Sequence, residues 1–382
     1  MKYHLITYGC QMNTADSTEM AQPLKDRGMI ATGDPAQADI ILMNTCTVRE
    51  QAEHRAHSNL GRLREWKEEN PQRILIVAGC AATRWGESIK KQYPFIDLVS
   101  PATRIEEFPE TVAQVLKERW NWTKETLEDF GNTSVSRAAS EAIAPSENLF
   151  GDDKTAYITI MRGCNYTCSY CIVPQVRGRE SYRPLAQILE DVRANVALGF
   201  REVMLVGQTV NSYYDRGPEM AVKDFADLLR AVDAVEGLEN IRFMSPHPRH
   251  MKPRVIQAMA DCKKVARHLH LPIQSGSDRM LAAMKRLYTR ADYLAIVQQL
   301  RSAIPGIMIT TDVIVGYPGE TDEDFKATLD LMNEIKFDGI FAFKYSPRPG
   351  TTAADLPDDV NNPLKEERLQ TVLALNRSLQ AA

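Results

Sequence analysis

Six of the chain's seven cysteines fall into two triplets that are built in different ways. One triplet is compact and forms a C-x3-C-x2-C loop within MRGCNYTCSYC: Cys164, Cys168 and Cys171. The other is spread along the chain, and each member closes an apolar run: Cys10, Cys46 and Cys80. Three thiolates can hold three irons of a 4Fe–4S cluster and leave the fourth iron open to a reactant. The two triplets therefore predict two clusters that take part in chemistry rather than in electron storage alone.

Zinc is the main alternative for the compact loop. A structural zinc needs a fourth ligand and usually shows paired C-x2-C spacing, which the loop lacks. Cys262 and His247 are the nearest further ligands by type, and only the fold could bring them to the loop. Disulfides are disfavoured because the cysteine count is odd and no export signal precedes them. The spacing thus favours iron–sulfur clusters, with zinc as the alternative.

The composition is that of an ordinary globular protein. The chain has 382 residues, of which 44% are hydrophobic and 25% charged, and its net charge is −4. That length allows two or three domains. No run approaches the ~18 uninterrupted apolar residues of a membrane span, and MKYHLITYGCQMN does not resemble a signal peptide. We therefore expect a cytoplasmic protein without a membrane partner, whose thiols stay reduced. The near-neutral charge neither requires nor excludes a nucleic-acid partner.

The spread triplet is expected to lie on an N-terminal domain, residues 1–128. Apolar runs alternate there with helical stretches: strands at 3–8, 39–44 and 73–79, and helices near 16–28, 48–68 and 84–92. Short strands separated by helices predict an open parallel sheet. The three cysteines are each about one βα unit apart, so they should converge at the carboxyl edge of the sheet.

The compact triplet is expected to lie on a second domain, residues 151–382, after a polar linker at 129–150. Six strand candidates alternate with helices: strands at 156–161, 202–206, 240–244, 268–273, 308–315 and 339–345, and helices at 185–198, 222–235, 252–261, 291–303, 321–335 and 364–379. This pattern predicts a partial (βα)6 barrel with ligands at its carboxyl-terminal face. The fold class is thus α/β, with an open parallel sheet followed by the partial barrel.

The compact loop, with an aromatic residue before its last cysteine, resembles the radical S-adenosylmethionine (SAM) enzymes. That resemblance implies a cluster whose open iron binds SAM and whose electron cleaves it to a 5′-deoxyadenosyl radical. It also implies cofactor contacts in the loop and at successive strand ends: Tyr170, Gly207, Gln208, Gln274, Ser275, Asp312 and Gly316. Ordinary glycine turns are the alternative interpretation of these strand ends.

The spread triplet in front of such a barrel resembles the methylthiotransferases, in which a second cluster supplies or carries sulfur. The motifs YGCQMNTADS, RGCNYTCSYCIVPQVRGRES and FKYSPRPGT resemble the branch that modifies isopentenyl-adenosine beside the tRNA anticodon. The resemblance implies two 4Fe–4S clusters and two SAM per turnover, one giving a methyl group and one cleaved. The product carries a methylthio group at carbon 2 of the adenine. For both triplets to serve one reaction, their two faces must meet at a shared cavity.

The same resemblance implies the partners: the tRNA anticodon stem-loop and a low-potential electron donor such as flavodoxin or ferredoxin, with the enzyme a monomer. Three arginines are expected to hold RNA phosphates through their planar forks: Arg177, Arg179 and Arg348. Ion pairing with nearby carboxylates, such as Glu180, is the alternative. An anticodon loop already exposes its bases, which makes unstacking of the target cheaper.

The chain departs from the family pattern in places. The family commonly ends in a small RNA-gripping β-barrel, the TRAM domain, which this chain is expected to lack. Thr209 stands where the branch usually has Asn, AATR follows Cys80, and SYRP replaces SRP at 181–184. These departures are expected to touch no cluster cysteine. Alternative functions are methylthio transfer to threonylcarbamoyl-adenosine tRNA or to a ribosomal protein, and a non-catalytic iron–sulfur redox or RNA-binding protein.

Overall fold

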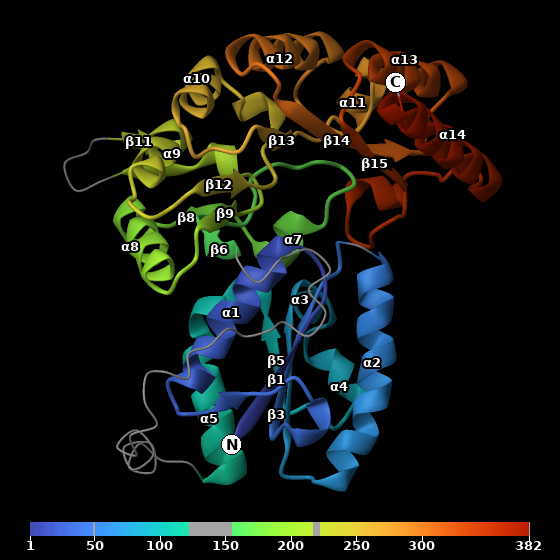
Figure 1. The fold of residues 1–382 in the computed structure, drawn as a ribbon. Coiled ribbons are helices and arrows are strands. Elements are labelled where there is room, and N and C mark those ends of the chain that lie inside the picture. Colours follow the sequence, from blue (N-terminus) through green and yellow to red (C-terminus); the bar gives the residue numbers. More distant parts are fainter. Residues whose placement is uncertain (49, 122–154, 217–221, 382) are drawn as a thin grey trace. The chain divides into compact units, whose positions relative to one another are not determined.

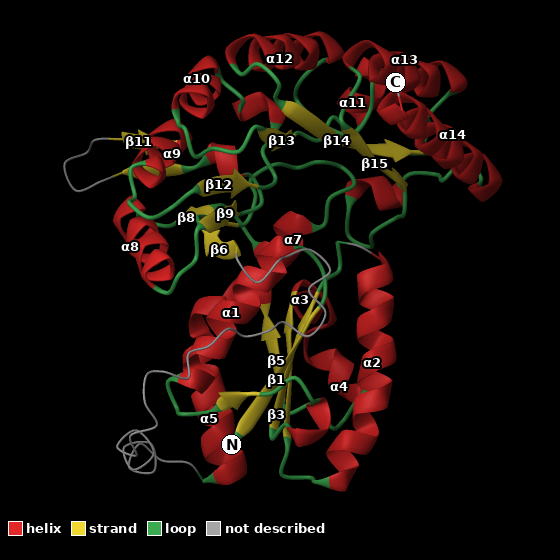
Figure 2. Ribbon diagram, viewed as in Figure 1, coloured by secondary structure: helices red, strands yellow, loops and turns green. Residues whose placement is uncertain are grey.

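The computed structural model describes residues 1–48, 50–121, 155–216 and 222–381, which form two compact units (Figures 1 and 2). Unit 1 comprises Met1–Tyr157 together with Gln175–Gly178, and unit 2 comprises Ile158–Pro174 and Arg179–Ala382. The linker expected at 129–150 lies outside the described residues. Each unit contains its own β-structure, and we describe the two separately.

Unit 1 is built on a five-stranded parallel sheet in the order β2-β1-β3-β4-β5. Its strands are β1 (Lys2–Thr7), β2 (Ile30–Ala31), β3 (Ile40–Thr45), β4 (Ile74–Gly79) and β5 (Leu98–Pro101). The three predicted strands are thus β1, β3 and β4. The two edge strands were not predicted, because two and four residues are too few to show a periodic pattern. This strand order is that of a doubly wound sheet.

Helices cover both faces of this sheet (Figure 1). The helices are α1 (Gln11–Lys25) and α5 (Phe108–Trp120) on one face, and α2 (Glu50–Glu69), α3 (Cys80–Trp85) and α4 (Ile89–Gln92) on the other. Short 3-10 turns complete the unit: η1 (Pro35–Gln37), η2 (Gly86–Ser88) and η3 (Ala102–Glu107). Along β3, Ile40 and Leu42 join one core while Ile41 and Met43 join the other. Burial on both faces explains why this strand is apolar throughout.

Unit 2 contains a partial barrel of six strands, as the sequence predicts. The strands form two three-stranded sheets, ordered β12-β9-β6 and β13-β14-β15. Their bounds are β6 (Thr155–Thr159), β9 (Glu202–Val206), β12 (Asn240–Phe243), β13 (His268–His270), β14 (Met308–Val315) and β15 (Gly339–Lys344). One bridge joins the sheets, since Ile241 donates to Lys264 O at 2.7 Å and accepts from Ala266 N at 2.9 Å. The six strands therefore follow one another in chain order.

Helices surround the barrel strands (Figure 2). The helices are α7 (Val173–Arg177), α8 (Leu185–Ala197), α9 (Phe225–Asp233), α10 (Pro253–Asp261), α11 (Asp278–Ala283), α12 (Arg290–Ala303), α13 (Asp322–Ile335) and α14 (Asn362–Ala381). Smaller elements are the hairpins β7 (Met161–Arg162) with β8 (Ser181–Tyr182) and β10 (Tyr214–Arg216) with β11 (Val222–Asp224), and the turns η5 (Val210–Ser212), η6 (Pro248–His250) and η7 (Thr352–Asp355). In the part of the chain that the structure describes, we find no helix that is long and apolar enough to cross a membrane.

Sequence-local capping fixes where the main barrel helices begin. Capping boxes start α9 at Asp224, α12 at Thr289 and α13 at Thr321, each with an aspartate three residues later. In such a box the cap side chain accepts a backbone N–H, and the later side chain accepts from the cap backbone. These helices begin within three residues of their predicted starts, so the strand ends that precede them are well defined.

Candidate functional site

The spread triplet follows three neighbouring strands of unit 1. Cys10 caps the N-terminus of α1 after β1, Cys46 directly follows β3, and Cys80 directly follows β4. The order in which strands are added to this sheet reverses between β1 and β3. Parallel α/β sheets bind ligands outside the carboxyl ends of the strands at such a switch point. The approach is close, because a Cβ on Gly9 would lie 2.6 Å from Cys46 Cβ. The three thiols thus belong to one edge of the sheet.

A buried polar frame supports this edge. Asn13 Nδ2 donates to Asn44 Oδ1 at 3.1 Å, and Asn44 Nδ2 donates back to the Asn13 carbonyl at 2.8 Å. Asn44 Nδ2 also donates to Ser17 Oγ at 3.0 Å. Cys10 Sγ lies 3.4 Å from Asn13 Oδ1. Buried polar groups must be paired, so this network fixes the loop after β3 against the first turn of α1.

Arg177 is buried in unit 1, where its segment Gln175–Gly178 belongs. Its Nη2 donates to Asp16 Oδ2 at 2.7 Å, and its Nε donates to Cys80 Sγ at 3.2 Å. The side chains of Arg177 and Asp16 are 4% and 2% exposed. This pairing corrects the expectation that Arg177 holds RNA phosphate, because its guanidinium is enclosed. Burial raises the pKa of the Cys80 thiol, and the Arg177 charge opposes that rise.

Gly79, the last residue of β4, tests how closely the atoms at this edge are packed. It has a φ of +96°, and a Cβ there would overlap Asn44 Oδ1 and the Thr45 carbonyl. We expect Gly79→Ala to lower the free energy of unfolding of unit 1 by about 2–4 kcal/mol, from backbone strain plus overpacking. Urea denaturation followed by tryptophan fluorescence measures this, because the described tryptophans, Trp66, Trp85 and Trp120, lie in unit 1.

Gly28→Ala is the matched control for Gly79→Ala. Gly28 also has a positive φ, +72°, but a Cβ there would meet nothing within 4 Å. It should lose only the backbone contribution, about 1–2 kcal/mol. Equal losses in the two variants would show that the edge around Cys80 is not closely packed.

The compact triplet lies in the loop between β7 and α7 of unit 2. Its three thiols are partly buried, and Cys171 N donates to Cys168 O at 3.0 Å, which makes the loop turn back on itself. Burial raises the pKa of the Cys164 thiol and raises that of Cys171 to about 12. Such thiols lose their protons only to a metal or beside a fixed positive charge.

Both triplets supply the type of donor that iron–sulfur clusters bind, although in the described part of the chain their side chains are not grouped as a metal site. All seven cysteines are free thiols, so none is consumed by a disulfide. Within the described ranges, no three His, Cys, Asp or Glu side chains are grouped so that they could hold a metal ion. Each triplet offers three soft sulfur donors next to an arginine, Arg177 for Cys80 and Arg286 for Cys168. Cys262 stands apart from both, at the C-terminal end of α10.

The turn after β9 is attached to the compact loop. A Cβ on Gly207 would lie 2.5 Å from Met161 Cγ, and Gln208 Oε1 accepts from Gly163 N. Thr209 Oγ1 lies 3.4 Å from Cys164 Sγ. This contact corrects the expectation that the unusual residues avoid the cluster cysteines. The sequence could not show it, because 45 residues separate the two side chains.

The predicted residues after β13 take different roles. Gln274 has a φ of +74°, and it forms an isolated bridge with Val313 of β14. A non-glycine residue in this region is strained, which is common at functional sites. The Ser275 hydroxyl is buried and lies 3.3 Å from Thr328 Oγ1, so it supports the loop from inside.

Asp312 lies on one face of the β13-β14-β15 sheet. Its partner across the ladder is Phe341, and its Oδ2 lies 3.3 Å from His270 Nε2. The opposite face carries Leu269, Ile309 and Val313, which are fully buried. The Asp312 side chain stays partly exposed, so it can reach a ligand.

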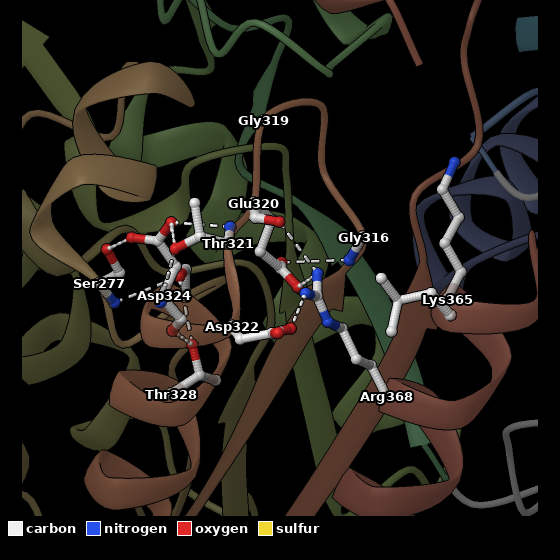
Figure 3. A network of polar contacts seen from close by, with 12 residues as sticks. Ser277, Gly316, Gly319, Glu320, Thr321, Asp322, Asp324, Thr328, Lys365 and Arg368 are labelled. Carbon is white, nitrogen blue, oxygen red and sulfur yellow. Dashed lines mark hydrogen bonds and ion pairs between the residues drawn. The ribbon is translucent and has the colours of Figure 1, made fainter. Parts of the chain in front are cut away.

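Gly316 belongs to a network that joins the end of β14 to α14 (Figure 3). Its N–H donates to Glu320 Oε2 at 3.1 Å, and Arg368 Nη1 donates to Glu320 Oε1 at 2.8 Å. Gly316 has a φ of +70°, and a Cβ there would overlap the Lys365 side chain. The sequence predicted a role for Gly316 but not for Glu320 or Arg368. These two residues belong to no motif, and they pair only in the folded chain, across 48 residues.

In the sequence, His247 is a possible metal ligand or part of a polar loop, residues 247–250, at the active face; in the structure it is a buried residue of unit 2. Its ring stacks on Tyr166 with centroids 4.2 Å apart, and its Nδ1 accepts from Arg249 N at 3.2 Å. The other ring nitrogen, Nε2, is buried without a hydrogen-bond partner among the described residues. Burial lowers the pKa of His247 to about 2, with the nearby Arg286 charge as the second cause.

This lowered pKa predicts a dependence of stability on pH. An unfolded histidine takes up a proton below pH ~6.5, while folded His247 refuses it until about pH 2. The contribution of neutral His247 to the free energy of unfolding is therefore complete above pH ~6.5 and declines as the pH falls. At pH ~5 it is smaller by about 2 kcal/mol. We expect His247→Phe, which keeps a ring against Tyr166, to lose this share of the pH dependence. The measurement is urea denaturation at pH ~6.5 and at pH ~5, followed by circular dichroism.

His54→Phe serves as the control for the pH experiment. His54 is an exposed residue of α2 in unit 1, so its replacement makes the same change of side chain away from the Tyr166 stack. Identical pH dependence in wild type and His247→Phe would contradict the assignment of a neutral, buried His247.

Comparison with known proteins agrees with this architecture. The profile of the Radical SAM superfamily matches residues 158–332, and that of "Uncharacterized protein family UPF0004" matches residues 2–101. The chain is 43% identical to the tRNA-2-methylthio-N(6)-dimethylallyladenosine synthase of Sorangium cellulosum, covering 100% of this chain and 78% of that protein. It is 42% identical to the synthase of the same name from Pelotomaculum thermopropionicum, covering 99% of this chain and 82% of that protein.

Solved structures support the fold. The radical SAM methyltransferase TsrM from Kitasatospora setae, solved with cobalamin and a [4Fe-4S] cluster, has a TM-score of 0.64 at 15% identity, covering 92% of this chain and 77% of that one. The cobalamin-dependent radical enzyme OxsB has a TM-score of 0.57 at 14% identity, covering 97% and 56%. The partial barrel with its compact cysteine loop is that of a radical SAM enzyme. Within that class, the chain belongs to the tRNA-2-methylthio-N(6)-dimethylallyladenosine synthase family, as its curated relatives show.

Proposed function

We propose that the protein is a tRNA methylthiotransferase. It inserts a methylthio group at carbon 2 of isopentenyl-adenosine next to the anticodon and uses two SAM per turnover. The observation that carries this proposal is the identity of 43% to a synthase of that name over the whole chain. The two cysteine triplets support it, because each stands at the carboxyl end of a strand where a reactive cluster is useful.

Each triplet would hold one 4Fe–4S cluster in this function. Cys164, Cys168 and Cys171 would hold the cluster that binds SAM, and the spread triplet would hold a second cluster for sulfur. When bound, the first cluster supplies the electron that cleaves SAM to a 5′-deoxyadenosyl radical. The residues fit this role, because burial raises the pKa of the Cys80, Cys164 and Cys171 thiols, and a bound metal, with Arg177 beside Cys80, would stabilise the thiolate form.

The remaining predicted residues would position SAM and RNA. The Gly207–Thr209 turn holds the compact loop, and the Gly316 loop is fixed by Glu320 and Arg368, so both are preorganised. Tyr170 and the strand-end residues Gly207, Gln208, Gln274, Ser275, Asp312 and Gly316 are proposed to surround SAM, with Ser275 acting from within the fold. Arg179 is exposed and Arg348 partly exposed, which suits contacts to RNA phosphates.

The wider setting is also proposed. The domains are residues 1–128 and 151–382 with a linker at 129–150. The partners are the tRNA anticodon stem-loop and a low-potential donor such as flavodoxin or ferredoxin. The enzyme is proposed to act as a monomer in the cytoplasm.

Mass spectrometry of tRNA nucleosides from a deletion strain tests the function. The methylthio form of isopentenyl-adenosine should disappear and its unmodified precursor should accumulate. A plasmid with the wild-type gene should restore the product, and one with Cys164→Ala should not. Loss of methylthio-threonylcarbamoyl-adenosine, or of a modified ribosomal protein, would instead assign one of the alternative substrates. Unchanged nucleosides combined with no SAM cleavage in vitro would support a non-catalytic iron–sulfur protein.

A further inference from the structure

Arg286 is a buried cation beside the compact triplet. The residue is 6% exposed and stands between α11 and α12. Its Nη1 lies 3.4 Å from Cys168 Sγ and 3.3 Å from Tyr170 Oη, and its Nε donates to Tyr288 Oη at 3.0 Å. The guanidinium also lies over the Tyr288 ring, 5.3 Å from its centroid. One cation thus contacts two residues of the cysteine loop.

No carboxylate pairs with Arg286 in the described part of the chain. Its remaining polar contact is weak, because Nη2 lies 3.5 Å from the Pro272 carbonyl. A buried charge without a counter-charge costs several kcal/mol, and arginine stays protonated in proteins. Among the neighbours of Arg286, Cys168 is the group that becomes negative when it binds iron. The guanidinium is therefore placed where an anionic Cys168 thiolate would neutralise its charge.

The backbone around Arg286 is strained in a way that keeps this side chain inside. Lys285 has a φ of +55° and Leu287 a φ of +58°, both in the left-handed region. Each such non-glycine residue is strained and persists only where the surrounding structure imposes it. Leu287 is exposed while Arg286 is buried, which is the reverse of what each side chain prefers. Packing alone does not explain this arrangement.

We propose that Arg286 is the counter-cation of the compact cluster and raises its reduction potential through Cys168. The inference rests on the proposed function for the presence of the cluster. One-electron reduction adds one negative charge and no proton, and a fixed positive charge nearby stabilises the reduced form. The electron comes from the low-potential donor in the cell and from dithionite in the experiment. Arg286 is thus a positioning and tuning residue rather than a SAM ligand.

The test uses the full-length chain with Cys10, Cys46 and Cys80 replaced by alanine, so that one cluster remains. After anaerobic reconstitution, the midpoint potential is measured by dithionite titration with detection of the reduced cluster by electron paramagnetic resonance. We expect Arg286→Gln to shift the potential to more negative values and Arg286→Lys to restore most of it. Arg254→Gln is the matched control, because it removes the same charge from an exposed ion pair of unit 2. It should not shift the potential.

An unchanged potential in Arg286→Gln would overturn the proposal, as would weaker SAM binding with no change in potential. If Arg286→Gln holds no iron, the lysine variant decides: a near-wild-type potential supports the need for charge, and equal loss of iron overturns it. No tRNA enters this experiment. A wrong assignment of the substrate would therefore leave the result unaffected, and the two proposals fail separately.

Discussion

Replacement of Cys164, Cys168 and Cys171 by alanine is expected to abolish the formation of 5′-deoxyadenosine. Replacement of the spread triplet is expected to leave that reaction intact and to abolish methylthio transfer. The reason is the proposed division of labour between the triplets: the three thiols on the compact loop would hold the cluster that binds SAM, and the three thiols at the edge of the unit 1 sheet would hold the cluster that provides sulfur. Deoxyadenosine is measured by chromatography under anaerobic conditions, and methylthio transfer by nucleoside mass spectrometry on an anticodon stem-loop.

Iron analysis accompanies these activity assays. The reconstituted wild-type chain should bind about eight irons, and each triple variant about four. Cys262→Ala is the control, since this thiol lies at the end of α10 and should leave both iron content and activity unchanged. Zinc in place of iron, or the same loss of both activities in the two triple variants, would contradict the assignment.

Replacement of Arg368 by methionine is expected to lower the free energy of unfolding of unit 2 by about 3–5 kcal/mol. Arg368 and Glu320 are 3% and 4% exposed, so the substitution leaves a carboxylate buried without its partner. Burial raises the pKa of Glu320, with the Gly316 N–H and Arg368 opposing it. The deficit should therefore be smallest below the ordinary glutamate pKa of ~4.3 and should grow as the pH rises through the raised value.

The chain offers a close control for this experiment. Lys344 of β15 and Glu366 of α14 form another ion pair, but both side chains are exposed, so Lys344→Met should cost less than about 1 kcal/mol. Urea denaturation followed by circular dichroism reports both units, whereas tryptophan fluorescence reports unit 1 and should not change. The double variant Glu320→Gln with Arg368→Met should recover part of the loss. Similar losses of unfolding free energy in Arg368→Met and Lys344→Met would show that the buried pair stabilises unit 2 no more than the exposed pair does.

The strands could be predicted because burial leaves a local trace in the sequence. Runs such as IILMNT are apolar over their whole length, since helices cover both faces of the sheet. The start of α1 was placed five residues too late, because its first turn is polar and Cys10 offers no side-chain cap. Asn13 of that turn, followed by Asp16 and Ser17, is buried in the network behind the cysteines rather than exposed. Tertiary contacts thus outweighed the local pattern there.

The site could be predicted where its chemistry is written into a short motif. The cysteine spacing and the glycine at the end of β14 are of this kind. Arg286, Glu320 and Arg368 have no such motif, because their roles arise from burial and from partners 48 to 118 residues away. Arg177 shows the opposite error. Its charge next to the cysteine motif predicted a contact to RNA phosphate, whereas its side chain is buried in an ion pair with Asp16.

The barrel is a composite of two halves, because in the described residues β12 is linked toward β13 through one bridge, between Ile241 and Val265, which precedes β13. One half carries the compact cysteine loop and the Gly207–Thr209 turn, and the other carries Gln274, Asp312 and Gly316. Neither half holds a full set of the proposed SAM contacts. A ligand that contacts both halves would link them across the place where few backbone hydrogen bonds join them. The cofactor would then be part of what holds the scaffold together, and that place offers a natural junction for exchanging halves between relatives.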